Sequence, residues 1–277
     1  MTTLSPSTSL FRKHIALPQQ HGSWALWLGP YVIGIGVGGA FKIELIWLTL
    51  ASLGGFLLLQ PLTVLIKVIA GRKPQTDLAP SLFWSTLYSL LALLNLTQLL
   101  ITNYYFLYLA LAALPVLVWQ LILVMRREER GQMGIELVGS GVLALAAPAA
   151  YWIAKDGMNL TGWLLWILCW IQSAGAIVYI YLRLEHRRLT EMPNAQDRLN
   201  MATRALLYNT FNVVAVIALV AFSYIPTLVV IPFIVMLLEV IYGALIKPGI
   251  GAKPVLIGVR QVVITVIFVA LMILTYR

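Results

Sequence analysis

Residues Tyr105–Met125 read YFLYLALAALPVLVWQLILVM, and Arg126–Arg130 directly after them read RREER. Apart from Gln120, the first run consists of apolar and aromatic residues. A helix needs about 20 such residues to cross a hydrocarbon layer about 30 Å thick. The run is therefore predicted to be a transmembrane helix that ends at a cluster of arginines.

Similar apolar runs lie on both sides of this segment, at Ser23–Phe41, Glu44–Ile66, Leu82–Ile101, Ile135–Ala154, Thr161–Leu182, Ala205–Ser223, Pro226–Ile246 and Val255–Tyr276. Because the runs are continuously apolar rather than alternating, they indicate a helical bundle and not an outer-membrane barrel. Hydrophobic residues make up 61% of the chain and charged residues 10%, against about 45–50% and 25% in soluble domains. The predicted fold class is all-α, a polytopic membrane protein with about nine transmembrane helices.

The sequence favours one transmembrane domain, residues 21–277, after a short cytoplasmic tail, residues 1–20. The tail carries serines and basic residues and lacks the apolar stretch of a cleavable signal. The longest predicted connection, residues 183–204, is too short for a separate soluble domain. Cys169 is the single cysteine, which excludes an internal disulfide and a cysteine-rich metal site.

The basic residues divide unevenly between the two faces that nine crossings would create. Only Lys42, Lys155 and Arg277 fall on the face opposite the amino terminus. Because cytoplasmic loops carry an excess of Lys and Arg, this pattern predicts a cytoplasmic (inner) membrane protein. Its amino terminus is expected in the cytoplasm and its carboxyl terminus on the opposite side. If the count were wrong by one helix, every later loop would change sides and the basic residues would be spread over both faces. The asymmetry therefore also supports nine crossings.

The net charge of +9 allows two interpretations. Positive-inside loops and attraction to anionic lipid headgroups explain it without any specific ligand. Alternatively, the basic loops converge over one cytoplasmic cavity and bind an anionic headgroup or diphosphate, for which arginine provides a bidentate fork. The lipid bilayer is the expected partner, nucleic acid is not, and protein partners are unknown.

Ionisable residues within the apolar runs are expected to have a structural or functional role, because a charge at the bilayer centre costs about 2.5–3.5 kcal/mol on insertion scales. Glu239 and Arg260 lie at similar depths on consecutive antiparallel helices and could form an ion pair. Such a pair could fix the helix register, or belong to a headgroup or proton site. Glu136 opens the fifth run, where an acid complements the helix dipole.

Other polar residues are candidates for either packing or binding. His21 lies at the mouth of the first helix, which suits an interfacial position or a polar headgroup. Residues expected in the bundle interior are Gln60, Lys67, Gln172, Asn209 and Asn212, where such groups also join helices by hydrogen bonds. The glycines from Gly29 to Gly39 indicate close helix packing.

Motifs of soluble enzymes are missing from the sequence. It contains no Gly-rich phosphate loop or nucleophile elbow, and His14, His21 and His186 are not at the spacing of zinc ligands. No cofactor and no metal is predicted.

Three segments resemble the YwiC-like family of bacterial membrane proteins, namely Leu17–Trp24, Arg126–Leu137 and Lys253–Gly258. More distantly, the Pro- and Gly-rich first helix and residues Gly131–Leu137, followed by Ala146–Pro148, resemble the UbiA superfamily of intramembrane prenyltransferases. This second resemblance implies a UbiA-like bundle that covers most of the chain.

Members of that superfamily hold magnesium and a prenyl diphosphate with two Asp-rich motifs, because clustered carboxylates bind the divalent cation. The corresponding stretches here, Lys67–Asp77 and Tyr181–Arg188, are dominated by basic residues. The resemblance therefore implies a prenyl- or group-transferase without metal. Its diphosphate would be neutralised by Arg126, Arg127, Arg130, Arg183, Arg187 and Arg188.

The leading hypothesis is a protein that binds an isoprenoid, quinone-like or other anionic lipid in a cavity open to the cytoplasm. Its predicted site residues are His21, Lys67, Arg126, Arg127, Arg130, Glu136, Arg183, Glu185, Arg187, Arg188, Glu239 and Arg260. The polar intramembrane residues also motivate a rival, a small-solute transporter or permease. A non-catalytic membrane scaffold is the third alternative, since fold does not fix function.

Overall fold

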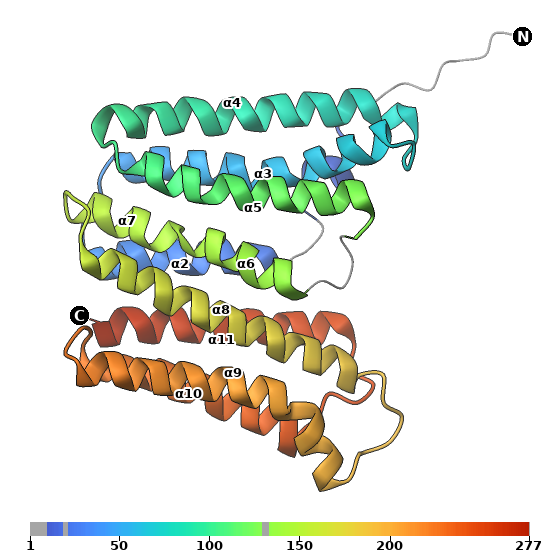
Figure 1. Cartoon of the computed structure of the whole chain (residues 1–277), viewed down its shortest axis with the longest axis vertical. Coiled ribbons are helices and arrows are strands. Elements are labelled where there is room, and N and C mark those ends of the chain that lie inside the picture. The colour runs from blue at the N-terminus through green and yellow to red at the C-terminus, as the bar shows by residue number, and fades with distance from the viewer. Residues whose placement is uncertain (1–9, 19–21, 129–132, 277) are drawn as a thin grey trace, which may run out of the picture. The chain divides into compact units, whose positions relative to one another are not determined.

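The computed structural model describes residues 10–18, 22–128 and 133–276. All regular structure in these ranges is helical. The helices divide into two compact units (Figure 1). Unit 1 comprises residues 1–20 and 42–132, and unit 2 comprises residues 21–41 and 133–277.

Unit 1 contains three long helices and two short ones. They are α1 (Lys13–Ala16), α3 (Glu44–Ile69), the 3-10 turn η1 (Gln75–Asp77), α4 (Leu78–Thr102) and α5 (Phe106–Arg126). Unit 2 holds the remaining helices: α2 (Gly22–Gly38), α6 (Met133–Ala144), α7 (Ala146–Ala154), α8 (Leu160–His186), α9 (Ala195–Ala221), η2 (Thr227–Val229), α10 (Val230–Ile241), the π-helical turn η3 (Tyr242–Ile246) and α11 (Pro254–Tyr276).

Each predicted apolar run coincides with a helix or with consecutive helical segments in the described ranges. Eight of these segments are long and apolar enough to cross a membrane. The ninth, α2, has 17 residues, which is the lower limit of the range of about 17–25 for a membrane span. The prediction of an all-α polytopic membrane protein is confirmed.

The surfaces of several helices are apolar at mid-length. Exposed side chains there include Leu93 and Leu94 on α4, Leu207 and Phe211 on α9, and Val266 on α11. Water would disfavour such surfaces, whereas lipid tails are as apolar as the side chains themselves. The chain is therefore an integral membrane protein that crosses the bilayer several times.

The fifth predicted run is interrupted at Leu145, between α6 and α7. Pro148 explains the break, because proline lacks the N–H that would bond to the carbonyl of Ala144 and its ring clashes with that carbonyl. The two segments together still form one candidate span, Met133–Ala154. The interruption at Leu145 therefore does not divide the predicted membrane crossing.

The seventh helix begins ten residues earlier than predicted, at Ala195 rather than Ala205. The side-chain oxygen of Asn194 accepts a hydrogen bond from the backbone N–H of Asp197 at 2.8 Å, which caps the helix start. The predicted start of this helix lies too late in the sequence, because the prediction used hydrophobicity and the first turns of α9 are polar. The connection after α8 is correspondingly shorter than the predicted one.

The glycines of α2 allow close packing inside unit 2. A Cβ added at Gly34 would collide with the carbonyl oxygen of Ala147 and lie 2.9 Å from the Cβ of Ala150. One added at Gly36 would lie 2.6 Å from Cγ1 of Ile273 on α11. The interpretation of this glycine-rich segment as a packing surface is confirmed.

The amino-terminal segment of unit 1 packs against α3 and α4. Ile15 is fully buried and contacts a cluster that includes Val64 and Val68. The hydroxyl of Tyr88 donates a hydrogen bond to the carbonyl of Ala16 at 2.8 Å, and Arg12 pairs with Asp77. Residues around α1 are therefore held to the α3–α4 hairpin by apolar contacts and an ion pair.

Basic residues gather at one end of the helices in each unit. In unit 2, Arg183 and Arg198 donate hydrogen bonds to carbonyls of Lys247 and Leu245, which joins the end of α8, the start of α9 and the end of η3. Lys155 follows α7 at the other end. In unit 1, Arg72 donates to the carbonyl of Val124, which joins the α3–α4 connection to the end of α5. The charge asymmetry of the sequence is thus also a property of each unit.

Candidate functional site

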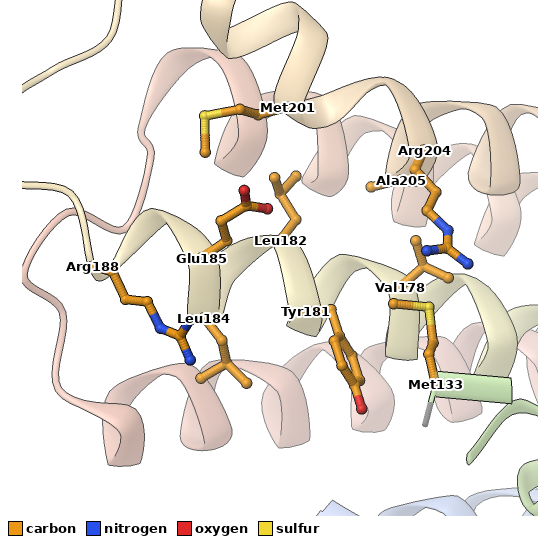
Figure 2. Close-up of a pocket in the computed structure, with 10 residues that line it drawn as sticks. All are labelled: Met133, Val178, Tyr181, Leu182, Leu184, Glu185, Arg188, Met201, Arg204 and Ala205. Carbon is orange, nitrogen blue, oxygen red and sulfur yellow. The ribbon is translucent and has the colours of Figure 1, made fainter. Parts of the chain in front are cut away.

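A cavity of about 460 Å³ opens at the basic end of unit 2 (Figure 2). Its lining comes from the start of α6, the last turns of α8 with the residues that follow, and the first half of α9. The lining residues are Met133, Val178, Tyr181, Leu182, Leu184, Glu185, Arg188, Met201, Arg204 and Ala205. The cavity therefore combines a mainly apolar wall with charged groups.

The periodicity of α8 produces one wall of this cavity. Tyr181 and Leu182 lie three and four residues after Val178, and Glu185 lies four and three residues after them, which places all four on one face of the helix. Val178 and Leu182 are also part of a buried cluster with Ala202 and Ala205 of α9. Packing between α8 and α9 thus fixes the positions of the polar side chains on the same face.

The charged residues of the cavity are available to a ligand. Arg188 and Arg204 come from different elements and lie at opposite ends of the lining group (Figure 2). Both are exposed, and neither forms an ion pair or hydrogen bond within the described part of the chain. Glu185, between them along the cavity, is also exposed and without an ion-pair partner there. Two free guanidinium groups at one cavity favour an oxyanion.

Tyr181 connects the cavity to Glu136. Its hydroxyl donates a hydrogen bond to Oε1 of Glu136 at 3.0 Å, which ties α8 to the first turn of α6. The prediction that Glu136 lies in a first helical turn is confirmed. This hydrogen bond fixes the position of the Tyr181 ring in the cavity wall. Glu136 therefore influences the shape of the cavity through Tyr181.

A second polar cluster lies on a neighbouring face of α8, toward α10, η3 and α11. Glu239 accepts a charged hydrogen bond from Nε of Arg260 at 2.6 Å, and the hydroxyl of Tyr179 lies 3.5 Å from the same oxygen. The guanidinium of Arg260 also lies over the ring of Tyr242, 5.7 Å from its centroid. The predicted Glu239–Arg260 ion pair is confirmed.

Arg183 joins this cluster to the π-helical turn. Its Nη1 donates to the carbonyls of Gly243 at 2.7 Å and Lys247 at 2.8 Å. These carbonyls lie at the carboxyl end of η3, where backbone acceptors lack partners within the helix. A side chain at position 243 would collide with the hydroxyl of Tyr179, so glycine is needed for this close approach. Arg183 therefore fastens η3 to α8.

The structure brings together only part of the predicted site. Glu185 and Arg188 line the cavity, Glu136 reaches it through Tyr181, and Arg187 is exposed outside the lining. Arg183, Glu239 and Arg260 form the second cluster. Lys67, Arg126 and Arg127 belong to unit 1, and His21 and Arg130 lie outside the described residues.

Tyr181 and Arg204 are cavity residues that the sequence analysis did not select. Arg204 was counted among the loop charges, and only the early start of α9 turns it toward the cavity. Tyr181 could have been found from its three-residue spacing to Val178 and four-residue spacing to Glu185. Asn209 and Asn212, expected to join helices, donate to the carbonyls of Gly175 and Ile171 on α8, so that prediction is confirmed.

Within residues 10–18, 22–128 and 133–276, no three His, Cys, Asp or Glu side chains come close enough together to hold a metal ion. The arginines Arg188 and Arg204 of the cavity suit the binding of an anion.

Comparison with known proteins gives one match. Residues 17–151 match the sequence model of the family described as YwiC-like protein. No curated protein and no solved structure matches the chain. The chain is a multi-pass integral membrane protein that is similar, over residues 17–151, to the YwiC-like family.

Proposed function

We propose that the protein binds an amphiphilic lipid with an anionic headgroup in the cavity of unit 2. The observation that carries this proposal is that Arg188 and Arg204 lie beside an apolar wall and have no ion-pair partner in the described part of the chain. An isoprenoid phosphate, a quinone-like lipid or another anionic lipid has the matching chemistry. The UbiA-like architecture of this cavity stays a prediction.

The position of the cavity fits such a ligand. Arg188 follows the last residue of α8, and Arg204 lies in the third turn of α9, so both belong to the ends of membrane-spanning segments. Headgroups of a bilayer lie at this level, and surface arginines attract them. Met133, Val178 and Leu182 offer an apolar surface for a chain that extends toward the hydrocarbon layer.

Native mass spectrometry with lipid identification tests this proposal. In the Arg188→Gln, Arg204→Gln variant we expect a specifically bound anionic lipid to be lost, with affinity about tenfold or more lower, because each charge-assisted hydrogen bond contributes about 1.5–3 kcal/mol. Lys253→Gln is the matched control, since Lys253 is a basic, exposed residue of unit 2 outside the cavity. Equal lipid retention in both variants would reject the cavity as the binding site.

A group-transfer reaction would extend this proposal. An anionic leaving group such as a diphosphate could be held by Arg188 or by Arg204, with Glu185 and the Tyr181–Glu136 pair on the same cavity. These residues offer a carboxylate and a hydroxyl to the bound headgroup. The transferase hypothesis rests on this arrangement and on the distant sequence resemblance.

A transporter is the second candidate function. Unit 2 has another cavity, of about 550 Å³, at the end opposite the basic residues. It is lined by Val37, Gly38, Gly39, Tyr151, Lys155, Thr161, Tyr224, Pro226 and Tyr276, a mainly polar set. Cavities at both ends of one bundle favour solute passage. Detection of bulk phospholipid alone in the mass-spectrometry experiment would favour the transporter over the lipid-binding protein.

Cysteine labelling tests the proposed orientation in the cytoplasmic membrane. Cys169 is buried, so a Cys169→Ser background can carry single cysteines at Thr190, between α8 and α9, or Met158, between α7 and α8. In intact cells a membrane-impermeant maleimide is expected to label Met158→Cys and to spare Thr190→Cys, because the basic end faces the cytoplasm. Detergent permeabilisation should expose Thr190→Cys. The reverse labelling pattern would invert the topology.

A further inference from the structure

Arg183 is a buried arginine with three of its five N–H donors unused among the described residues. Its residue exposure is 7%, and Nη1 makes both of its hydrogen bonds, to Gly243 and Lys247. Within the described residues, Nε and Nη2 have no acceptor and no carboxylate lies within ion-pair distance. The Nε–Nη2 edge is the side of a guanidinium that binds two oxygens of a carboxylate or phosphate together.

The polar cluster around Arg183 has an unbalanced positive charge. Arg260 already uses the single carboxylate of the cluster, Glu239, at 2.6 Å. Arg183 is left with carbonyl oxygens, which carry only partial negative charge at the end of a helix. Arg183 is 7% exposed and has no carboxylate partner among the described residues, so it is free to pair with an anion.

Gly249 packs closely against the guanidinium of Arg183. A Cβ added at this glycine would lie 3.0 Å from Cζ, 3.0 Å from Nη2 and 3.3 Å from Nε of Arg183. These distances are shorter than ordinary carbon contacts, so any other residue would crowd the guanidinium. Glycine thus keeps the loop between η3 and α11 close to Arg183 without covering its free N–H groups with a side chain.

His186 is a buried polar group without a partner at this place. It is fully buried, and neither Nδ1 nor Nε2 has a hydrogen-bond partner among residues 10–18, 22–128 and 133–276. His186 follows Arg183 by three residues on α8, so both side chains lie on the same face of the last turn. Buried polar groups are normally bonded, and an orphan imidazole next to a half-used guanidinium indicates a missing ligand.

We infer that Arg183 and His186, with Gly249 opposite them, form a binding site for a phosphate-type oxyanion. Two oxygens of the anion would accept from Nε and Nη2 of Arg183, and a further oxygen would accept from a protonated ring nitrogen of His186. The last turn of α8 lies at the level where the helix leaves the hydrocarbon layer, which is where phosphate groups are found. Both a lipid phosphate and free phosphate have this chemistry.

This site is separate from the cavity of the proposed function. Arg183, His186 and Gly249 are absent from the cavity lining, and Arg183 contacts η3 rather than α9. The oxyanion site therefore does not depend on the amphiphile proposal. A variant of Arg188 and Arg204 is expected to retain it.

Orthophosphate is the probe for the free anion, and nanodiscs test the lipid source. The full-length protein in neutral phosphatidylcholine nanodiscs is titrated with orthophosphate while its thermal unfolding is followed. A parallel series replaces part of the phosphatidylcholine with phosphatidic acid. Gly249→Ala keeps every charge and crowds Arg183, while His186→Gln removes the imidazole and keeps a polar side chain.

Two variants serve as matched controls. In Gly258→Ala the added Cβ meets no heavy atom within 4 Å, and in His14→Gln the replaced side chain is 44% exposed. We expect phosphate or phosphatidic acid to stabilise the wild type and both controls. The apparent dissociation constant should rise about tenfold or more in Gly249→Ala and His186→Gln, by loss of at least one charge-assisted hydrogen bond.

The two series also identify the source of the anion. Stabilisation by orthophosphate supports a free-anion site, and stabilisation by phosphatidic acid alone supports a lipid phosphate at the same residues. The inference is overturned by equal stabilisation of all variants, or by no response of the wild type to either probe.

Discussion

Gly34→Val is expected to lower the free energy of unfolding by about 3 kcal/mol, at the upper end of the effect of overpacking a well-packed core. The added atoms would meet the backbone carbonyl of Ala147 on α7, and the carbonyl carbon would lie 3.1 Å from the new Cβ. A backbone cannot rotate away as a side chain can, so α2 and α7 have to separate. The change is measured by unfolding in mixed detergent and SDS micelles, followed by far-ultraviolet circular dichroism.

Gly55→Val is the matched control for this prediction. Gly55 lies within α3, and an added Cβ there meets no atom within 4 Å. The same chemical change should therefore alter stability little. Similar losses in Gly34→Val and Gly55→Val would show that valine itself, and not contact with α7, causes the destabilisation.

Glu239→Leu is expected to destabilise the protein by about 3 kcal/mol, whereas Arg260→Leu should have a smaller effect. A carboxyl group left alone can take up a proton and become neutral, but a guanidinium remains charged. The estimate is at the lower end for a broken buried pair, because the Arg260 side chain is 30% exposed and can extend toward the interface. The same micelle unfolding measurement applies.

The double variant Glu239→Leu, Arg260→Leu separates pairing from packing. Replacing both partners by apolar groups is often neutral, so its stability should lie near that of the wild type and above that of Glu239→Leu. If the two single losses simply add in the double variant, the ion pair does not account for either of them. Tyr179 would then be the first neighbour to examine, since its hydroxyl lies 3.5 Å from Glu239.

Continuous apolar runs were sufficient to predict the membrane helices, because each crossing has to be apolar over its whole length. The helix ends were less predictable. Asn194 starts α9 before its apolar part begins, through a hydrogen bond to Asp197. Pro148 interrupts the helix at Leu145 within a run that remains apolar. Such boundaries depend on which backbone hydrogen bonds can form, and the hydrophobicity of the sequence does not show this.

The candidate site was predictable only where one helix or one turn sets the geometry. Glu239 and Arg260 could be paired because they lie at similar distances from the turn that joins their helices. The cavity depends on how α6, α8 and α9 pack, so the roles of Tyr181 and Arg204 were not visible in the sequence. Arg183 fastens η3 through two carbonyls, a role that the sequence does not show. Side-chain direction at a helix end depends on neighbours far away in the chain.

The most direct test of the amphiphile proposal is an experimental structure of the full chain in nanodiscs prepared from native membrane lipids. We predict elongated density that begins at the guanidinium of Arg188 or Arg204 and continues along Met133, Val178 and Leu182. The Arg188→Gln, Arg204→Gln variant should lose this density and keep the fold of unit 2. A cavity without lipid density in the wild type, with ordered lipids resolved elsewhere around the protein, would contradict the proposed function.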